Sequence, residues 1–157
     1  MKFQVKGHRV YYYADEQILS NSNWAIRIGA INHNVKKTYD EKSMTGLIAA
    51  GRSFSWYSDG NPDFTAKMPD MVSIMAVPQG AVEIVGTDNA RILHNGKGPK
   101  YAHEFKGKDF SVWINCDFAA MLDELGHSKL VGRDSYSSVY ALSCDGDVMG
   151  VFMPIKA

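Results

Sequence analysis

The chain has 157 residues, of which 45% are hydrophobic and 22% charged, as in an ordinary globular protein. Lys plus Arg and Asp plus Glu each number 17, so the formal net charge is zero. This balance argues against a nucleic-acid binder that works through bulk positive charge. The length suits one domain, and the sequence has neither a low-complexity tract nor a proline-rich linker. We therefore predict a single domain over residues 1–157.

The N-terminal residues lack the apolar run of a secretion signal. No stretch approaches the roughly 18 apolar residues of a membrane span. We therefore expect a cytoplasmic protein that does not act at a membrane. The two cysteines, Cys116 and Cys144, form no metal-binding motif. We expect two buried or half-buried thiols in a reducing compartment.

In the first third of the chain, apolar alternation is the main signal. Residues 9–13 are aromatic-rich and read as a strand. In residues 24–31 every second side chain is apolar, which favours a strand over the alternative of a helix. Residues 33–43 are charged and read as a loop or the start of a short helix. Residues 44–50 fit a short helix or a strand equally well.

The middle of the chain reads as a succession of strands and tight turns. We predict apolar strand segments at residues 53–57, 71–77, 81–85, 90–94 and 101–105, separated by turns at 58–60, 78–80, 88–89 and 95–99. The turns are indicated by glycine, proline, asparagine and aspartate, which favour the backbone conformations that turns require.

The last third follows a different pattern. Residues 110–114 read as a strand, and residues 115–125 place apolar side chains at helical spacing, with Asn115 or Asp117 able to cap the start and Gly126 at the stop. Strands are then predicted at 129–131, 137–142 and 148–153, with an Asp-Gly turn at 145–146. The fold class is therefore α+β, a mostly antiparallel sheet with one or two helices.

The aromatic residues divide by the face that they are expected to occupy. We predict that Trp24 and Trp113 lie in the core and that Tyr12 and Tyr57 are exposed. No histidine pair has metal-ligand spacing, and neither a nucleophile elbow nor a phosphate-binding loop occurs in the sequence. We therefore expect a protein that is not an enzyme and uses no cofactor or metal.

Three stretches carry a resemblance to a known family. Residues 110–125 read FSVWINCDFAAMLDEL, residues 133–139 read RDSYSSV and residues 150–156 read GVFMPIK. In this order and spacing they resemble the last domain of the bacterial DNA polymerase III β sliding clamp, and residues 71–89 are similar to the hairpin that precedes it. The resemblance covers about 85 residues and implies a sliding-clamp-like domain.

The resemblance also implies a function without catalysis. Sliding clamps encircle double-stranded DNA and dock short peptides of replication and repair proteins. Carried over by position, the peptide-binding residues would be Ser138, Val139, Val151, Met153, Pro154 and Ile155. The alternative is that Val151 and Met153 are core residues of an edge strand, because apolar alternation usually reflects packing. The nearest residues able to contact DNA phosphates would be Lys97, Lys100, Lys106, Lys108, Lys129 and Arg133.

The chain departs from the family in two ways. A clamp subunit has several such domains, whereas this chain has room for one, so a ring would require self-association into a homo-oligomer. The helix that would face DNA carries Asp117, Asp123 and Glu124, which phosphates would repel. The alternative hypothesis is a virus- or mobile-element-type interaction protein that binds a host protein, because zero net charge and many aromatic side chains suit a protein interface.

Overall fold

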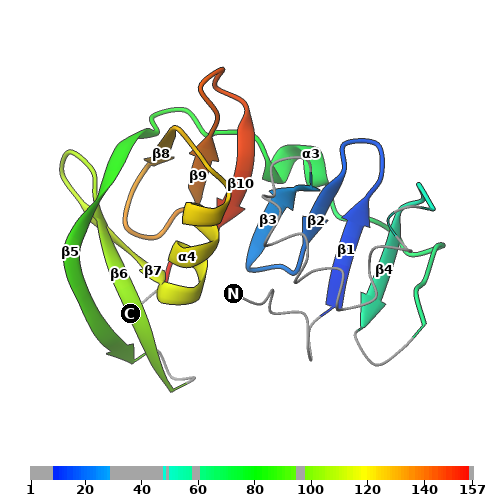
Figure 1. The fold of residues 1–157 in the computed structure, drawn as a ribbon, viewed down its shortest axis with the longest axis horizontal. Helices are drawn as coiled ribbons and strands as arrows, with labels where there is room; N and C mark the ends of the chain where they lie inside the picture. The colour runs from blue at the N-terminus through cyan, green and yellow to red at the C-terminus, as the bar shows by residue number, and fades with distance from the viewer. Residues whose placement is uncertain (1–8, 29–47, 49, 58–60, 95–97, 156–157) are drawn as a thin grey trace. The chain divides into compact units, whose positions relative to one another are not determined.

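The computed structural model describes residues 9–28, 48, 50–57, 61–94 and 98–155. The chain divides into two compact units, Met1–Met75 and Ala76–Ala157 (Figure 1). Each unit is described by itself below. The single domain expected from the sequence stays a prediction.

The first unit contains an antiparallel sheet. Its strands are β1 (Arg9–Tyr13), β2 (Ile18–Ser20), β3 (Trp24–Arg27) and β4 (Phe54–Tyr57), in the spatial order β4-β1-β2-β3. Side-chain hydrogen bonds hold the β2–β3 connection. Asn21 Oδ1 accepts from the N–H groups of Asn23 and Trp24, and Ser20 Oγ donates to the Trp24 carbonyl. These side-chain bonds add to the backbone bond from the Asn21 N–H to the Trp24 carbonyl at 3.1 Å, and they satisfy the buried polar groups of Ser20 and Asn21.

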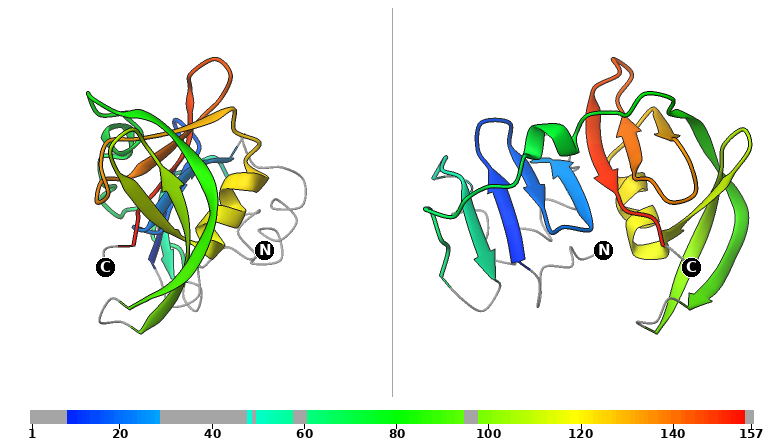
Figure 2. Two further views of the ribbon diagram at one scale, coloured as in Figure 1. Left: turned by 90° about the vertical axis from the view of Figure 1, so that its left-hand side faces the viewer. Right: turned by 180° about the vertical axis from the view of Figure 1, so that it is seen from behind.

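The second unit is larger than the first and contains a helix of nine residues, α4. Its elements are β5 (Val82–His94), β6 (Pro99–Lys106), β7 (Ser111–Asn115), α4 (Cys116–Glu124), β8 (Lys129–Gly132), β9 (Val139–Leu142) and β10 (Val148–Phe152). The strands are antiparallel in the order β10-β9-β8-β5-β6-β7. Figure 2 shows these strands and α4 from two further sides.

Helix α4 packs on the sheet through its apolar side. It contacts β6 and β7, where Val112 and Ile114 are fully buried. The ring of Phe118 lies 6.0 Å from that of Phe152 on β10, and Leu122 is also buried. After β10, the Ile155 N–H donates to the carbonyl of Trp113 on β7 at 2.8 Å. The described residues after β10 therefore lie against β7, the strand at the far end of the sheet.

The predicted order strand, helix, strand, strand, strand over the last third of the chain is confirmed. Asn115 caps α4 by accepting from the Asp117 N–H at 2.9 Å. Gly126 follows the helix with φ +64°, a conformation that glycine adopts at little cost. The turn at Asp145-Gly146 is confirmed as well, with Ser143 N–H donating to the Asp147 carbonyl across it.

The strand predicted at residues 71–77 is wrong, because the structure has a short helix there, α3 (Met71–Ile74). Asp70 caps this helix, accepting from the Ser73 N–H at 3.1 Å and from the Ser73 hydroxyl at 2.6 Å. An apolar run of this length also fits a strand, but the aspartate directly before it is a strong helix-start signal.

The turn predicted at residues 88–89 is also wrong. Strand β5 continues through it, with a shift of register between Gly86 and Ala90. The carboxylate of the buried Glu104 on β6 accepts hydrogen bonds from Asn89 at 3.0 Å and from the Thr87 hydroxyl at 2.9 Å. These hydrogen bonds, that of Asn89 first, lower the pKa of Glu104. Polar residues typical of a turn are thus satisfied inside a β-bulge.

Other predictions have mixed outcomes. The prediction that Tyr12 is exposed is wrong: it is only 3% exposed, and its ring packs at a tilt against Phe54 with the ring centroids 5.5 Å apart. The core position of Trp24 is confirmed. Trp113 is half-buried, and Cys144 is exposed rather than buried. Strand β2 was not predicted. The segments predicted at residues 33–43, at most of 44–50, at the turn 58–60 and at 95–97, and the side chain of Tyr57, lie outside the described residues.

We predict that Phe152→Ala lowers the free energy of unfolding by about 3–5 kcal/mol, because it removes a fully buried ring that packs against Phe118. Urea unfolding followed by circular dichroism measures the change. Tyr136→Ala is the matched control: it removes an exposed ring of the same unit and should change stability by no more than about 0.5 kcal/mol. A loss below about 1 kcal/mol for Phe152→Ala would contradict this packing.

Candidate functional site

The six residues that the resemblance assigns to peptide binding all lie at the end of the second unit, but they differ in burial. Val139 and Val151 are 0% and 4% exposed, so they belong to the core, and Pro154 is buried too. Met153 is 37% exposed, and Ser138 and Ile155 are half-buried. Only the last three can offer side-chain surface to a partner in this conformation.

Two contacts attach Met153 and Ile155 to neighbouring elements. The Ser138 hydroxyl donates to the sulfur of Met153 at 3.0 Å. The Ile155 N–H donates to the Trp113 carbonyl at 2.8 Å. The residues after β10, which we call the tail (153–155), are therefore attached both to the start of β9 and to β7. An apolar tail is thus held next to a hydroxyl group at the surface.

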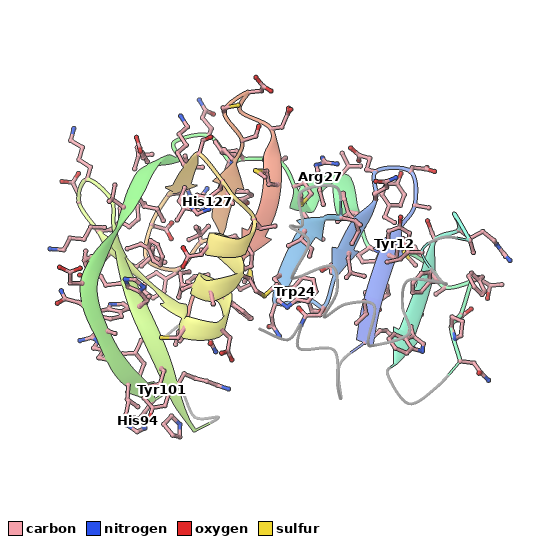
Figure 3. All side chains as sticks on the ribbon, in the orientation of Figure 1. Tyr12, Trp24, Arg27, His94, Tyr101 and His127 are labelled. Carbon is pink, nitrogen blue, oxygen red and sulfur yellow. The ribbon has the colours of Figure 1, made fainter. Side chains whose placement is uncertain are left out.

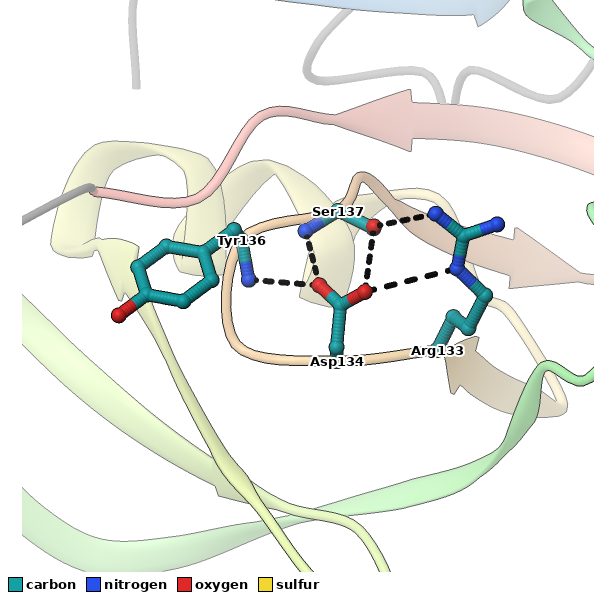
Figure 4. Close-up of polar contacts among 4 residues, drawn as sticks. All are labelled: Arg133, Asp134, Tyr136 and Ser137. Atoms are coloured by element: carbon teal, nitrogen blue, oxygen red, sulfur yellow. Dashed lines mark hydrogen bonds and ion pairs between the residues drawn. The ribbon is translucent and has the colours of Figure 1, made fainter.

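The loop before Ser138 is built around one carboxylate (Figure 4). Asp134 accepts from the N–H groups of Tyr136 and Ser137 at 2.9 and 2.7 Å, and from the Ser137 hydroxyl at 3.0 Å. Arg133 forms an ion pair with it at 3.5 Å and also donates to Ser137. These bonds, the Tyr136 N–H first, lower the pKa of Asp134. The loop leaves the Tyr136 ring exposed.

The residues proposed for DNA contact do not form one group. Register places two of them together: Lys106 pairs with Val85, and Leu130 pairs with Ile84, so Lys129 flanks Val85 from the other side. Because paired residues share a face of the sheet, both lysines lie on the face of Val85.

The remaining proposed DNA contacts are scattered. Lys108 is exposed between β6 and β7, and Arg133 is held in the loop described above. Lys100 is half-buried on β6, and Lys97 lies outside the described residues.

Sequence reasoning missed a cavity of about 340 Å³ between the β5–β6 strands and α4. It is lined by Glu83, Ile84, Val85, Gly86, His103, Phe105, Ala119, Leu122, Asp123, His127, Ser128, Lys129 and Leu130. These residues come from β5, β6, α4, β8 and the turn before β8. No local spacing in the sequence could have revealed the cavity, because it depends on how four separate elements pack.

Two histidines of this cavity have fixed roles. His103 Nε2 bonds to the Thr87 carbonyl, and His127 Nδ1 bonds to the Leu122 carbonyl at 2.8 Å. A carbonyl oxygen only accepts, so these two nitrogens carry the hydrogens. In the neutral rings the other nitrogens, His103 Nδ1 and His127 Nε2, are then acceptors. Figure 3 shows His127 beside α4.

Among the described residues, no group of three or more histidine, cysteine, aspartate or glutamate side chains is placed to hold a metal ion. Over the same residues, no helix has the length and apolar character needed to cross a membrane. Comparison with known proteins finds no matching family model, no matching curated protein and no matching solved structure.

We predict that Asp134→Asn weakens the loop at neutral pH and that its effect disappears in acid. The native pKa lies below the ordinary value of 3.8, so the carboxylate stabilises the native state fully above that value and loses its contribution as pH falls through the lowered pKa. Thermal unfolding of variant and parent at a series of pH values should show a gap that closes below pH 3.8.

The control for this experiment is Asp145→Asn, which removes an equal charge from an exposed carboxylate in the turn between β9 and β10. This substitution should leave the midpoint temperature of thermal unfolding close to that of the parent at every pH in the series. A gap for Asp134→Asn that stays constant through the acid range would show that the charge is not what holds the loop.

Proposed function

We propose that this chain is a non-catalytic, sliding-clamp-like module that docks short peptides of replication or repair proteins at its tail. The observation that carries the proposal is the apolar tail (153–155), held beside Ser138 at the end of a strand, helix, strand, strand, strand unit. The same order of elements and the same ending are those that the resemblance assigns to the peptide-binding domain of a clamp.

The chemistry of the tail suits an extended peptide. Met153 offers a flexible, polarizable side chain, which adapts to apolar partners of different shape. Ile155 beside it is half-buried, so it can contribute further apolar contact. The Ser138 hydroxyl can exchange its weak bond to sulfur for a stronger bond to a peptide carbonyl. Apolar anchors with a few polar groups are the usual means of binding extended segments.

For DNA, the sheet is better suited than the helix. Asp117 and Asp123 are exposed on α4, and DNA phosphates would be repelled there. Lys106 and Lys129 share the outer face of the sheet and could contact phosphates, which requires charge and not sequence reading. With zero net charge, any such binding depends on these local contacts and on several copies acting together.

One observation favours the second candidate, an interaction protein of a virus or mobile element that binds a host protein. Ile92 and Tyr101 pair directly across β5 and β6 and are 47% and 69% exposed. Figure 3 shows Tyr101 near the end of this hairpin, close to His94. Exposed aromatic side chains are enriched at protein interfaces.

We predict that Met153→Ala weakens binding of a fluorescent clamp-binding peptide by about tenfold, because apolar contact with a 37% exposed side chain is lost. Fluorescence polarisation with the full chain measures the dissociation constant.

Ile92→Ala is the matched control for the peptide experiment. It removes a similar amount of exposed apolar surface from the same unit and should leave peptide affinity unchanged. If the parent chain shows no binding at high micromolar peptide, the tail is not a peptide site. A loss with Ile92→Ala but not with Met153→Ala would move the interface to the β5–β6 hairpin and favour the second candidate.

We also predict that the chain self-associates, because one such module cannot encircle DNA by itself. Size-exclusion chromatography with light scattering should give a mass that is a multiple of that of one chain. A strict monomer across the micromolar range would rule out the ring while leaving the peptide site untouched.

A further inference from the structure

The cavity between the β5–β6 strands and α4 has an apolar floor. Ile84, Phe105, Leu122 and Leu130 line it, and each of these side chains is nearly fully buried. Gly86 keeps the floor open: a Cβ at this position would lie 3.3 Å from Phe105 Cε1. The cavity measures about 340 Å³, the lower end of the range for small-molecule sites.

The polar groups of the cavity are mainly acceptors. His103 and His127 each donate one ring N–H to a backbone carbonyl. The second nitrogen of each neutral ring can therefore only accept. Asp123 adds a carboxylate, since it follows Ala119 by four residues and so lies on the same side of α4.

Two other charged residues border the cavity but belong to the opposite face of the sheet. Along β5, Glu83 alternates with the floor residue Ile84, and along β8, Lys129 alternates with the floor residue Leu130. The charge that remains on the side of the cavity is therefore the single negative charge of Asp123.

We propose that this cavity binds a small molecule with an aromatic or branched apolar body and a protonated amino group. The body would occupy the floor beside the Phe105 ring, where aromatic contacts are available. The ammonium group would donate to the histidine acceptors and pair with Asp123 at the rim, and an anionic head would be repelled there. This site is separate from the tail and does not depend on the peptide proposal.

The test is a titration of the full chain with phenethylamine, followed by amide chemical shifts in two-dimensional NMR. Neutral 2-phenylethanol and anionic 3-phenylpropanoate are the comparison probes, since they share the same ring. We expect saturable shifts at Gly86, His103, Phe105 and Ser128. We expect affinity to fall by about tenfold from the amine to the carboxylate.

Two adjacent alanines on α4 provide matched variants. Ala119 lines the cavity, whereas the exposed Ala120 is not among the residues that line it. Ala119→Leu should fill the cavity and abolish the shifts, whereas Ala120→Leu should preserve them. Alanine and leucine have similar helix propensities, so the helix itself is little affected.

A third variant covers the case in which Ala119→Leu fails to fold. Asp123→Asn alters an exposed side chain without a change of size, and it should weaken phenethylamine while leaving 2-phenylethanol unchanged. Equal affinities for the three probes, or unchanged titrations in Ala119→Leu, would overturn the proposal. The absence of saturable shifts with phenethylamine would overturn it as well.

Discussion

The backbone hydrogen bond from the Ile155 N–H to the Trp113 carbonyl is the contact on which the position of the tail depends. It attaches the residues after β10 to β7, although these strands stand at opposite ends of the strand order within the second unit. The sheet must curve to allow this, and the apolar side of α4 then has strands on more than one side. The contact between Phe118 and Phe152 lies within that arrangement. The position of the tail, the packing of α4 and the curvature of the sheet therefore depend on one another.

The second unit has two surfaces of different chemistry, one at the tail and one beside α4. At one, the tail presents Met153 beside Ser138, with no titratable group in the contact. At the other, the side of α4 that carries Ala119 and Asp123 borders a cavity with two histidine acceptors. A peptide with apolar anchors suits the first and a small cation suits the second. Because different residues line them, substitutions can test each surface without altering the other.

The sequence predicted the part of the fold that local signals encode. The cap at Asn115, the stop at Gly126 and the apolar spacing between them define α4 without tertiary information. Prediction failed at residues 71–77, where the cap at Asp70 outweighs the apolar run. It also failed at residues 88–89, where Glu104 on β6 accepts hydrogen bonds from polar side chains of β5.

For the candidate site, too, some features could be predicted from the sequence and others could not. The tail could be found from its order in the chain, but the burial of Val139 and Val151 could not. Strand alternation does not say which face is the core when both faces are covered. The cavity lay beyond sequence reasoning because Gly86, Ala119 and His127 become neighbours only through packing. Side-chain roles that depend on burial therefore need the structure, whereas the ends of α4 and the turn at Asp145-Gly146 do not.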